Sequence, residues 1–81
     1  MIKDIRNFIL EEELEIRIYK NKVNVVNYTK IGYFDKNKVI IYSTDKKIII
    51  TGDDIIVSKL MSDEILISGS IKNIEFRNAN E

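Results

Sequence analysis

Apolar and polar residues alternate along most of the chain from Glu15 onward, a pattern typical of β-strands. Polar stretches rich in Asn, Asp, Lys and Ser interrupt this alternation at short intervals, as in an all-β meander. The chain has no proline, but Asn and Asp tolerate the left-handed conformation that tight hairpins require. The pattern therefore predicts turns at residues 20–22, 27–30, 35–38, 44–47, 53–54 and 61–64.

Several predicted strands are apolar on both faces. Ile48 and Ile50 lie in one phase of the alternation and Ile49 lies in the other, and residues 39–42 and 65–67 repeat this arrangement. Since a sheet with one face in water would not show this pattern, the second face must be covered by a helix, by a folded-over part of the sheet or by another chain. We expect a mainly β fold, a curled antiparallel meander of about six to eight short strands that forms a small sandwich or a partly open barrel. A homo-oligomer would also cover the second face.

The first residues follow a helical period instead. Ile2, Ile5 and Ile9 recur at three- and four-residue spacing, which predicts an amphipathic helix over about residues 2–13. We expect this helix to pack on the sheet, because its polar face is not basic enough for a membrane surface. The chain thus divides into an N-terminal helix (1–14), a β domain (15–78) and a tail (79–81).

Two short segments repeat each other. The sequence I-I-I-T-G at 48–52 matches I-L-I-S-G at 65–69, and further apolar residues follow each glycine. Two imperfect copies favour a duplicated hairpin arrangement, while a parallel β-solenoid, which normally needs three or more units, is the alternative.

The second copy ends in an irregularity. Gly69 is in phase with Ile65, Ile67 and Ile71, so its missing side chain predicts a bend or bulge where another strand or the helix approaches closely. The phase then slips at residues 72–73. We interpret the slip as a turn or a second bulge that directs the next two apolar residues, Ile74 and Phe76, into the core.

The amino-acid composition limits the catalytic and metal-binding chemistry that the chain can perform. The chain has no cysteine and no histidine, which excludes disulfides and thiolate metal sites and removes the usual general base. Its acidic clusters fall in predicted turns or at the end of the helix, where carboxylates are solvated, so we expect no enzyme, no metal site and no cofactor. The apolar runs are too short to span a membrane, and the N-terminus lacks the pattern of a signal peptide. A cytoplasmic location without direct membrane insertion is expected.

The charge distribution leaves one binding hypothesis open. Thirteen basic and thirteen acidic residues balance overall, but the segment between Ile16 and Thr44 is rich in basic and aromatic residues. On a small β-barrel, such a face could bind single-stranded nucleic acid. Alternatively, the lysines mark turns and protect edge strands while the aromatic residues pack, which is the interpretation we favour. The basic residues concerned are Arg17, Lys20, Lys22, Lys30, Lys36 and Lys38.

An ordered set of motifs runs from Val23 to Phe76. The chain reads V-N-V-V-N-Y-T-K-I, then V-I-I-Y-S-T, then I-I-I-T-G-D-D-I-I-V, and finally E-I-L-I-S-G-S-I-K-N-I-E-F. This order resembles the YabP/YqfC family of sporulation proteins. The chain departs from the family pattern at residues 45–47, where members often place a glycine. The matching residues are Asn27, Tyr28, Ile31, Gly52, Ile55, Glu64, Ile65, Ile67, Gly69, Ile71, Ile74 and Phe76.

The resemblance implies a process more than a mechanism. It suggests a small non-enzymatic protein of endospore-forming Firmicutes, made in the mother cell and needed for spore or coat maturation. Its expected partners are other sporulation or coat proteins, including membrane-anchored ones, reached through protein–protein contacts in the mother-cell cytoplasm. The matching residues are expected to be structural.

Overall fold

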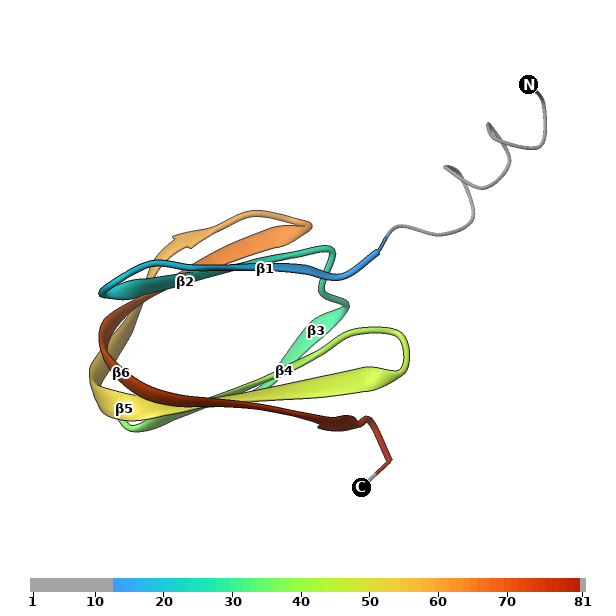
Figure 1. The fold of residues 1–81 in the computed structure, drawn as a ribbon. Helices are drawn as coiled ribbons and strands as arrows, with labels where there is room; N and C mark the ends of the chain where they lie inside the picture. The colour runs from blue at the N-terminus through green and yellow to red at the C-terminus, as the bar shows by residue number, and fades with distance from the viewer. Residues whose placement is uncertain (1–12, 81) are drawn as a thin grey trace, which may run out of the picture.

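The computed structural model describes residues 13–80, which form one antiparallel sheet of six strands (Figure 1). The order of strands across the sheet is β1-β2-β6-β5-β4-β3. The fold is therefore mainly β, as predicted, and the helix predicted over about residues 2–13 lies almost entirely outside the described residues. The strands are β1 (Glu15–Ile18), β2 (Lys22–Val26), β3 (Lys30–Phe34), β4 (Lys38–Tyr42), β5 (Lys46–Leu60) and β6 (Glu64–Asn78).

The two longest strands fold the sheet over on itself. β5 and β6 have 15 residues each, and both bend near their middle, so that the sheet makes two facing layers (Figure 1). The first layer contains β1, β2, residues 64–68 of β6 and residues 56–60 of β5. The second layer contains β3, β4, residues 46–51 of β5 and residues 73–78 of β6. The folded-over sheet therefore covers the inner face, but residues of the other phase, such as Ile49, lie on outer faces that no described element covers.

Two details of the predicted meander were wrong. The strands are not all short, because residues 53–54 lie inside β5 rather than in a turn. Asp54 does adopt a left-handed conformation, with φ of 53°, but here that conformation makes an irregularity in a continuous strand. In addition, only β3 to β6 form a meander, since the β1–β2 hairpin pairs with the far side of β6.

The bend predicted at Gly69 is confirmed. This residue has φ of 137°, and a Cβ atom placed on it would lie 2.8 Å from the carbonyl oxygen of Asp54. The slip at residues 72–73 is a bulge and not a turn, because Thr51 pairs with Asn73 while the next residue, Gly52, pairs with Ile71. The extra residue on β6 lets the strand turn the corner between the layers.

The core lies between the two layers. Ile48 and Ile50 are fully buried there, whereas Ile49 points to the outer face and is half-buried. Ile74 packs against the core as expected, but the placement of Phe76 in the core was wrong, because 55% of its surface is exposed. Phe76 has the inward phase, yet it lies at an edge of the sheet that no described element covers. The buried residues are Val23, Val25, Val39, Ile41, Ile48, Ile50, Ile55, Ile65 and Ile67.

The sheet has an internal duplication that extends the repeat seen in the sequence. The strand order is symmetric about the β5–β6 pair, so that β1-β2-β6 corresponds to β3-β4-β5. The sequence Lys-Asn-Lys-Val occurs at the β1–β2 turn and again at the β3–β4 turn. The carbonyl of Asn21 accepts a hydrogen bond from the N–H of Gly69 (3.1 Å), and the carbonyl of Asn37 accepts one from Gly52 (3.0 Å). Each hairpin thus anchors one bend, and the antiparallel pairing excludes a parallel solenoid for residues 13–80.

Candidate interaction surfaces

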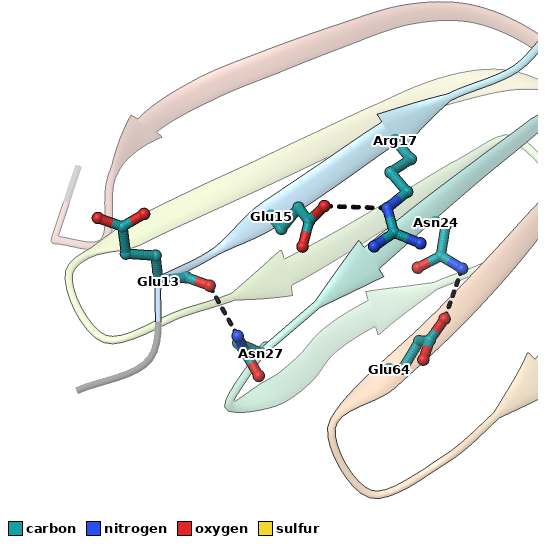
Figure 2. A network of polar contacts seen from close by, with 6 residues as sticks. All are labelled: Glu13, Glu15, Arg17, Asn24, Asn27 and Glu64. Atoms are coloured by element: carbon teal, nitrogen blue, oxygen red, sulfur yellow. Dashed lines mark hydrogen bonds and ion pairs between the residues drawn. The ribbon is translucent and has the colours of Figure 1, made fainter. Parts of the chain in front are cut away.

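The first motif matched in the sequence builds a corner between the layers. Asn27, at the start of the β2–β3 connection, has a left-handed backbone conformation with φ of 69°. Its N–H donates to the carbonyl of Asp63 (2.6 Å), and its Nδ2 donates to the carbonyl of Glu13 (2.8 Å; Figure 2). The hydroxyl of Tyr28 donates to the carbonyl of Met61 (2.8 Å). Both residues therefore fasten the connection to the β5–β6 turn.

A small polar network lies beside this corner on the outer face of the first layer. Asn24 Nδ2 donates to Glu64 Oε2 over 2.7 Å, which links β2 to β6 (Figure 2). On β1, Arg17 Nε lies 2.9 Å from Glu15 Oε2, and both side chains are about half exposed. The family-motif residue Glu64 thus links two neighbouring strands through its side chain.

The β3–β4 turn is fastened to the bend of β5. Asp35 Oδ1 accepts from the N–H groups of Asn37 (2.7 Å) and Lys38 (2.8 Å), and the Tyr33 hydroxyl donates to Asp35 Oδ2 (2.7 Å). The hydrogen bond from Tyr33, followed by that from Asn37, lowers the pKa of Asp35, so this exposed carboxylate stays ionised and shapes the turn. Asn37 Nδ2 also donates to the carbonyl of Gly52 (3.1 Å). Asn37 is not among the residues predicted from the sequence, although the repeated Lys-Asn-Lys-Val sequence marks its position.

Most of the remaining motif residues are also architectural. Ile55, Ile65 and Ile67 are buried in the core, and Ile31 and Ile71 are half-buried against it. Phe76 is the exception, because it is exposed at the edge of β6.

The exposed apolar side chains gather along strand edges. Because of the fold-over, β5 and β6 are central in one layer and outermost in the other, so each layer has two edges that pair with no other described strand. We define the β1–β6 side as β1 together with residues 73–78 of β6, and the β3–β5 side as β3 together with residues 56–60 of β5. Figure 1 shows β1 above the last part of β6. The exposed large apolar residues are Ile18, Tyr19, Tyr33, Phe34, Ile56, Leu60, Met61 and Phe76.

Comparison with known protein families shows which family the chain belongs to. The sequence pattern of the YabP family matches residues 6–81. This chain belongs to the YabP family. The match confirms the resemblance carried by the motifs from Asn27 to Phe76. No curated protein and no solved structure matches the chain.

The structure divides the six basic residues of this YabP-family chain between the two layers. Arg17, Lys20 and Lys22 belong to the first layer, on β1, β2 and the turn between them. The other three belong to β3, β4 and their turn in the second layer, where Lys30 Nζ lies 5.1 Å from the ring centre of Tyr42. The six residues therefore come from two separate hairpins, one in each layer.

Residues 13–80 contain no group of three or more acidic, histidine or cysteine side chains that could hold a metal ion. Over the same range, no helix has the length and apolar character needed to cross a membrane. The exposed strand edges, where the large apolar side chains gather, are the candidate functional surface of this family member.

Proposed function

We propose that this YabP-family protein is a non-enzymatic structural or assembly factor of sporulation, which acts in spore or coat maturation through contacts with other proteins. Family membership supports a sporulation-related role. The rest of the proposal rests on the exposure of large apolar side chains along the edges of a sheet whose inner face is buried. Exposed apolar patches and open strand edges are typical of surfaces that bind another chain.

The chemistry of the chain supports a non-enzymatic role. Neither histidine nor cysteine is present to act as a base or a nucleophile. Three of the carboxylates with identified partners serve the architecture: Glu64 joins two strands, Asp35 shapes a turn, and Asp53 pairs with Lys72 at the bend (2.8 Å).

The β3–β5 side is the surface we assign to partner proteins. Most of the exposed large apolar residues lie on it or next to it, namely Tyr33, Phe34, Ile56, Leu60 and Met61. Bulges interrupt both of its strands, at Gly32 in β3 and at Ser58 in β5. Since a bulge disrupts the regular ladder that strand addition needs, we expect partners to contact the side chains here rather than extend the sheet.

A genetic experiment tests the sporulation role. Deleting the gene in an endospore-forming host should lower the yield of heat-resistant spores, and the wild-type gene expressed in the mother cell should restore it. A fluorescent fusion should locate to the mother-cell compartment. Normal spore yield in the deletion strain would contradict the proposal.

A matched pair of variants tests the assigned surface. Leu60→Lys changes an exposed residue of the β3–β5 side, and Phe76→Lys changes one that is comparably exposed on the β1–β6 side (59% and 55%). If sporulation or coat proteins bind the β3–β5 side, Leu60→Lys should reduce their capture by the tagged protein from sporulating cells. Capture that is unaffected by Leu60→Lys would refute this assignment.

A further inference from the structure

The β1–β6 side presents one regular strand edge from each layer. Directly after β1, the N–H of Tyr19 donates to the carbonyl of Lys22 (2.8 Å), which makes these two residues a hydrogen-bonded pair. Such pairs alternate with non-bonded pairs along an antiparallel ladder, so Arg17 bonds to β2. Ile16 and Ile18 must then direct their N–H and C=O groups toward the open edge.

The same reasoning applies to β6. The N–H of Ala79 donates to the carbonyl of Asp45 (3.0 Å), just beyond the last strand pair. Alternation along the ladder then assigns the backbone groups of Arg77 and Glu75 to β5. The N–H and C=O groups of Phe76 and Ile74 face the open edge.

Both edges carry the same charge pattern. Each has a glutamate, an apolar residue and an arginine in succession: Glu15-Ile16-Arg17 in β1 and Glu75-Phe76-Arg77 in β6. The Arg Nε lies 2.9 Å from the Glu Oε2 in β1 and 2.7 Å in β6, and all four charged side chains are substantially exposed. The charged residues have the outward phase, and the apolar residue between them has the inward phase.

This pattern is complementary to itself. If such a strand pairs antiparallel with its own copy, centred on the apolar residue, each glutamate lies opposite an arginine of the other copy. The central residues, Ile16 or Phe76, then meet as a hydrogen-bonded pair, which uses the N–H and C=O groups left open at the edge. Opposite charges facing each other across strands stabilise such a pairing.

The positions of Ile16 and Phe76 allow the β1–β1 pairing and the β6–β6 pairing to form in the same dimer. Ile18 and Ile74 line the same surface hollow between the layers. β1 runs toward the bend, whereas the last part of β6 runs away from it (Figure 1). Ile16 therefore lies two residues farther from the bend than Ile18, and Phe76 lies two residues farther from it than Ile74. One two-fold axis perpendicular to the layers can therefore relate both pairs of strands.

The β3–β5 side, its counterpart in the internal duplication, lacks these features. Its two strands contain the bulges at Gly32 and Ser58 and carry Lys30 and Lys59, which protect edges against strand addition. By contrast, β1 pairs with β2, and residues 73–78 of β6 pair with β5, without any register shift. Only the β1–β6 side is built for regular pairing.

We propose that the protein forms a two-fold symmetric homodimer through the β1–β6 side. β1 pairs with β1 of the second copy around Ile16, and β6 pairs with β6 around Phe76, so that both layers continue across the interface. The dimer covers Ile18 and Phe76, which have the inward phase but are 63% and 55% exposed in the single chain. This inference rests on edge geometry and does not depend on the sporulation role.

Sedimentation equilibrium on the purified full chain tests the dimer. The wild type should be dimeric at micromolar concentration. Phe76→Lys should raise the dimer Kd about tenfold or more, because it places two like charges at a contact centre. Leu60→Lys is the matched control, since Leu60 occupies the corresponding place on the β3–β5 side and is 59% exposed. Its Kd should equal that of the wild type.

Charge exchange identifies the register. Glu15→Arg and Arg17→Glu should each weaken the homodimer, because like charges then face each other across the two-fold axis. A mixture of the two variants should form a heterodimer, since one β1 strand is then wholly basic and the other wholly acidic at these positions. Unchanged circular dichroism spectra and melting temperatures would show that the variants remain folded.

Three outcomes would overturn the proposal. One is a wild-type monomer at ~100 μM, far above the Kd of a specific dimer. The second is a dimer that Leu60→Lys weakens and Phe76→Lys leaves intact. The third is failure of the mixed charge variants to associate better than either variant alone. None of these outcomes bears on the spore yield of a deletion strain, so the two proposals can fail separately.

Discussion

Replacing Gly69 with valine perturbs the bend of the sheet at its tightest point. Gly69 has φ of 137°, a conformation that side chains with a β-carbon rarely adopt. A Cβ atom there would lie 2.8 Å from the carbonyl oxygen of Asp54 and 3.0 Å from the Cα of Ile55. Both neighbours are backbone atoms of β5, which cannot move without disturbing the pairing of β5 with β6.

The expected loss of stability follows from these two effects. Backbone strain at such a conformation costs about 1–3 kcal/mol, and forcing extra atoms into a packed site costs about 1–3 kcal/mol more. We therefore expect Gly69→Val to lower the free energy of unfolding by about 2–5 kcal/mol, a large fraction of the total for a domain of this size. The Tm should fall by at least about 8 °C, because each kcal/mol shifts the Tm of a small domain by about 4–8 °C.

Urea and thermal unfolding, followed by circular dichroism, would measure this change. Gly32→Ala is a suitable control. A Cβ atom at Gly32 would lie too close to the ring of Tyr42, so this ring must turn aside, but it is a side chain on the outer face and Gly32 has no left-handed φ. The control should therefore cost clearly less than Gly69→Val, because a side chain can move where the backbone of β5 cannot. If Gly69→Val melts within a few degrees of the wild type, the account of the bend is wrong.

Three further predictions concern the corner, the core and one turn. Asn27→Ala should destabilise the protein by about 1–2 kcal/mol, measured by urea unfolding, because it removes the bond to Glu13 and places alanine at φ of 69°. Ile41→Ala, which empties part of the buried core, should cost about 2–5 kcal/mol in the same assay, and a loss below about 1 kcal/mol would contradict the burial of this residue. For Asp35, the hydrogen bond from Tyr33 lowers the pKa in the folded state, so its contribution to stability is present above the unfolded pKa and is lost as the pH falls through the lower, folded pKa. Asp35→Asn should therefore be less stable than the wild type at neutral pH, and this difference should shrink at about pH 2; a difference independent of pH would argue against the carboxylate.

Local chemistry explains which turns could be predicted. Five of the six predicted turns fall between strands, where Asn, Asp and Lys residues meet water. The sixth was wrong because Asp53 and Asp54 are polar for a different reason. They lie exposed on the outside of the bend, inside a continuous strand. The local sequence does not distinguish a reversal of the chain from a bend, since both expose polar side chains and both use left-handed residues.

The candidate surfaces depended more heavily on the tertiary structure. Ile74 and Phe76 share one phase, but only Ile74 is packed against the core, because Phe76 lies farther along an uncovered edge. Likewise, Arg17 and Lys30 are close in sequence and belong to different layers, because the β2–β3 connection crosses from one layer to the other.

By itself, the sequence determined the strand content, most of the turns, the inward phase of the core residues and the need for a glycine at the bend. These properties depend on side-chain periodicity and on backbone conformations, which neighbouring residues specify. The tertiary structure alone decided that β2 pairs with β6, that β5 and β6 serve both layers, and which apolar edges remain open. Those properties depend on contacts between residues far apart in the chain, and no local pattern encodes which strand will lie beside another.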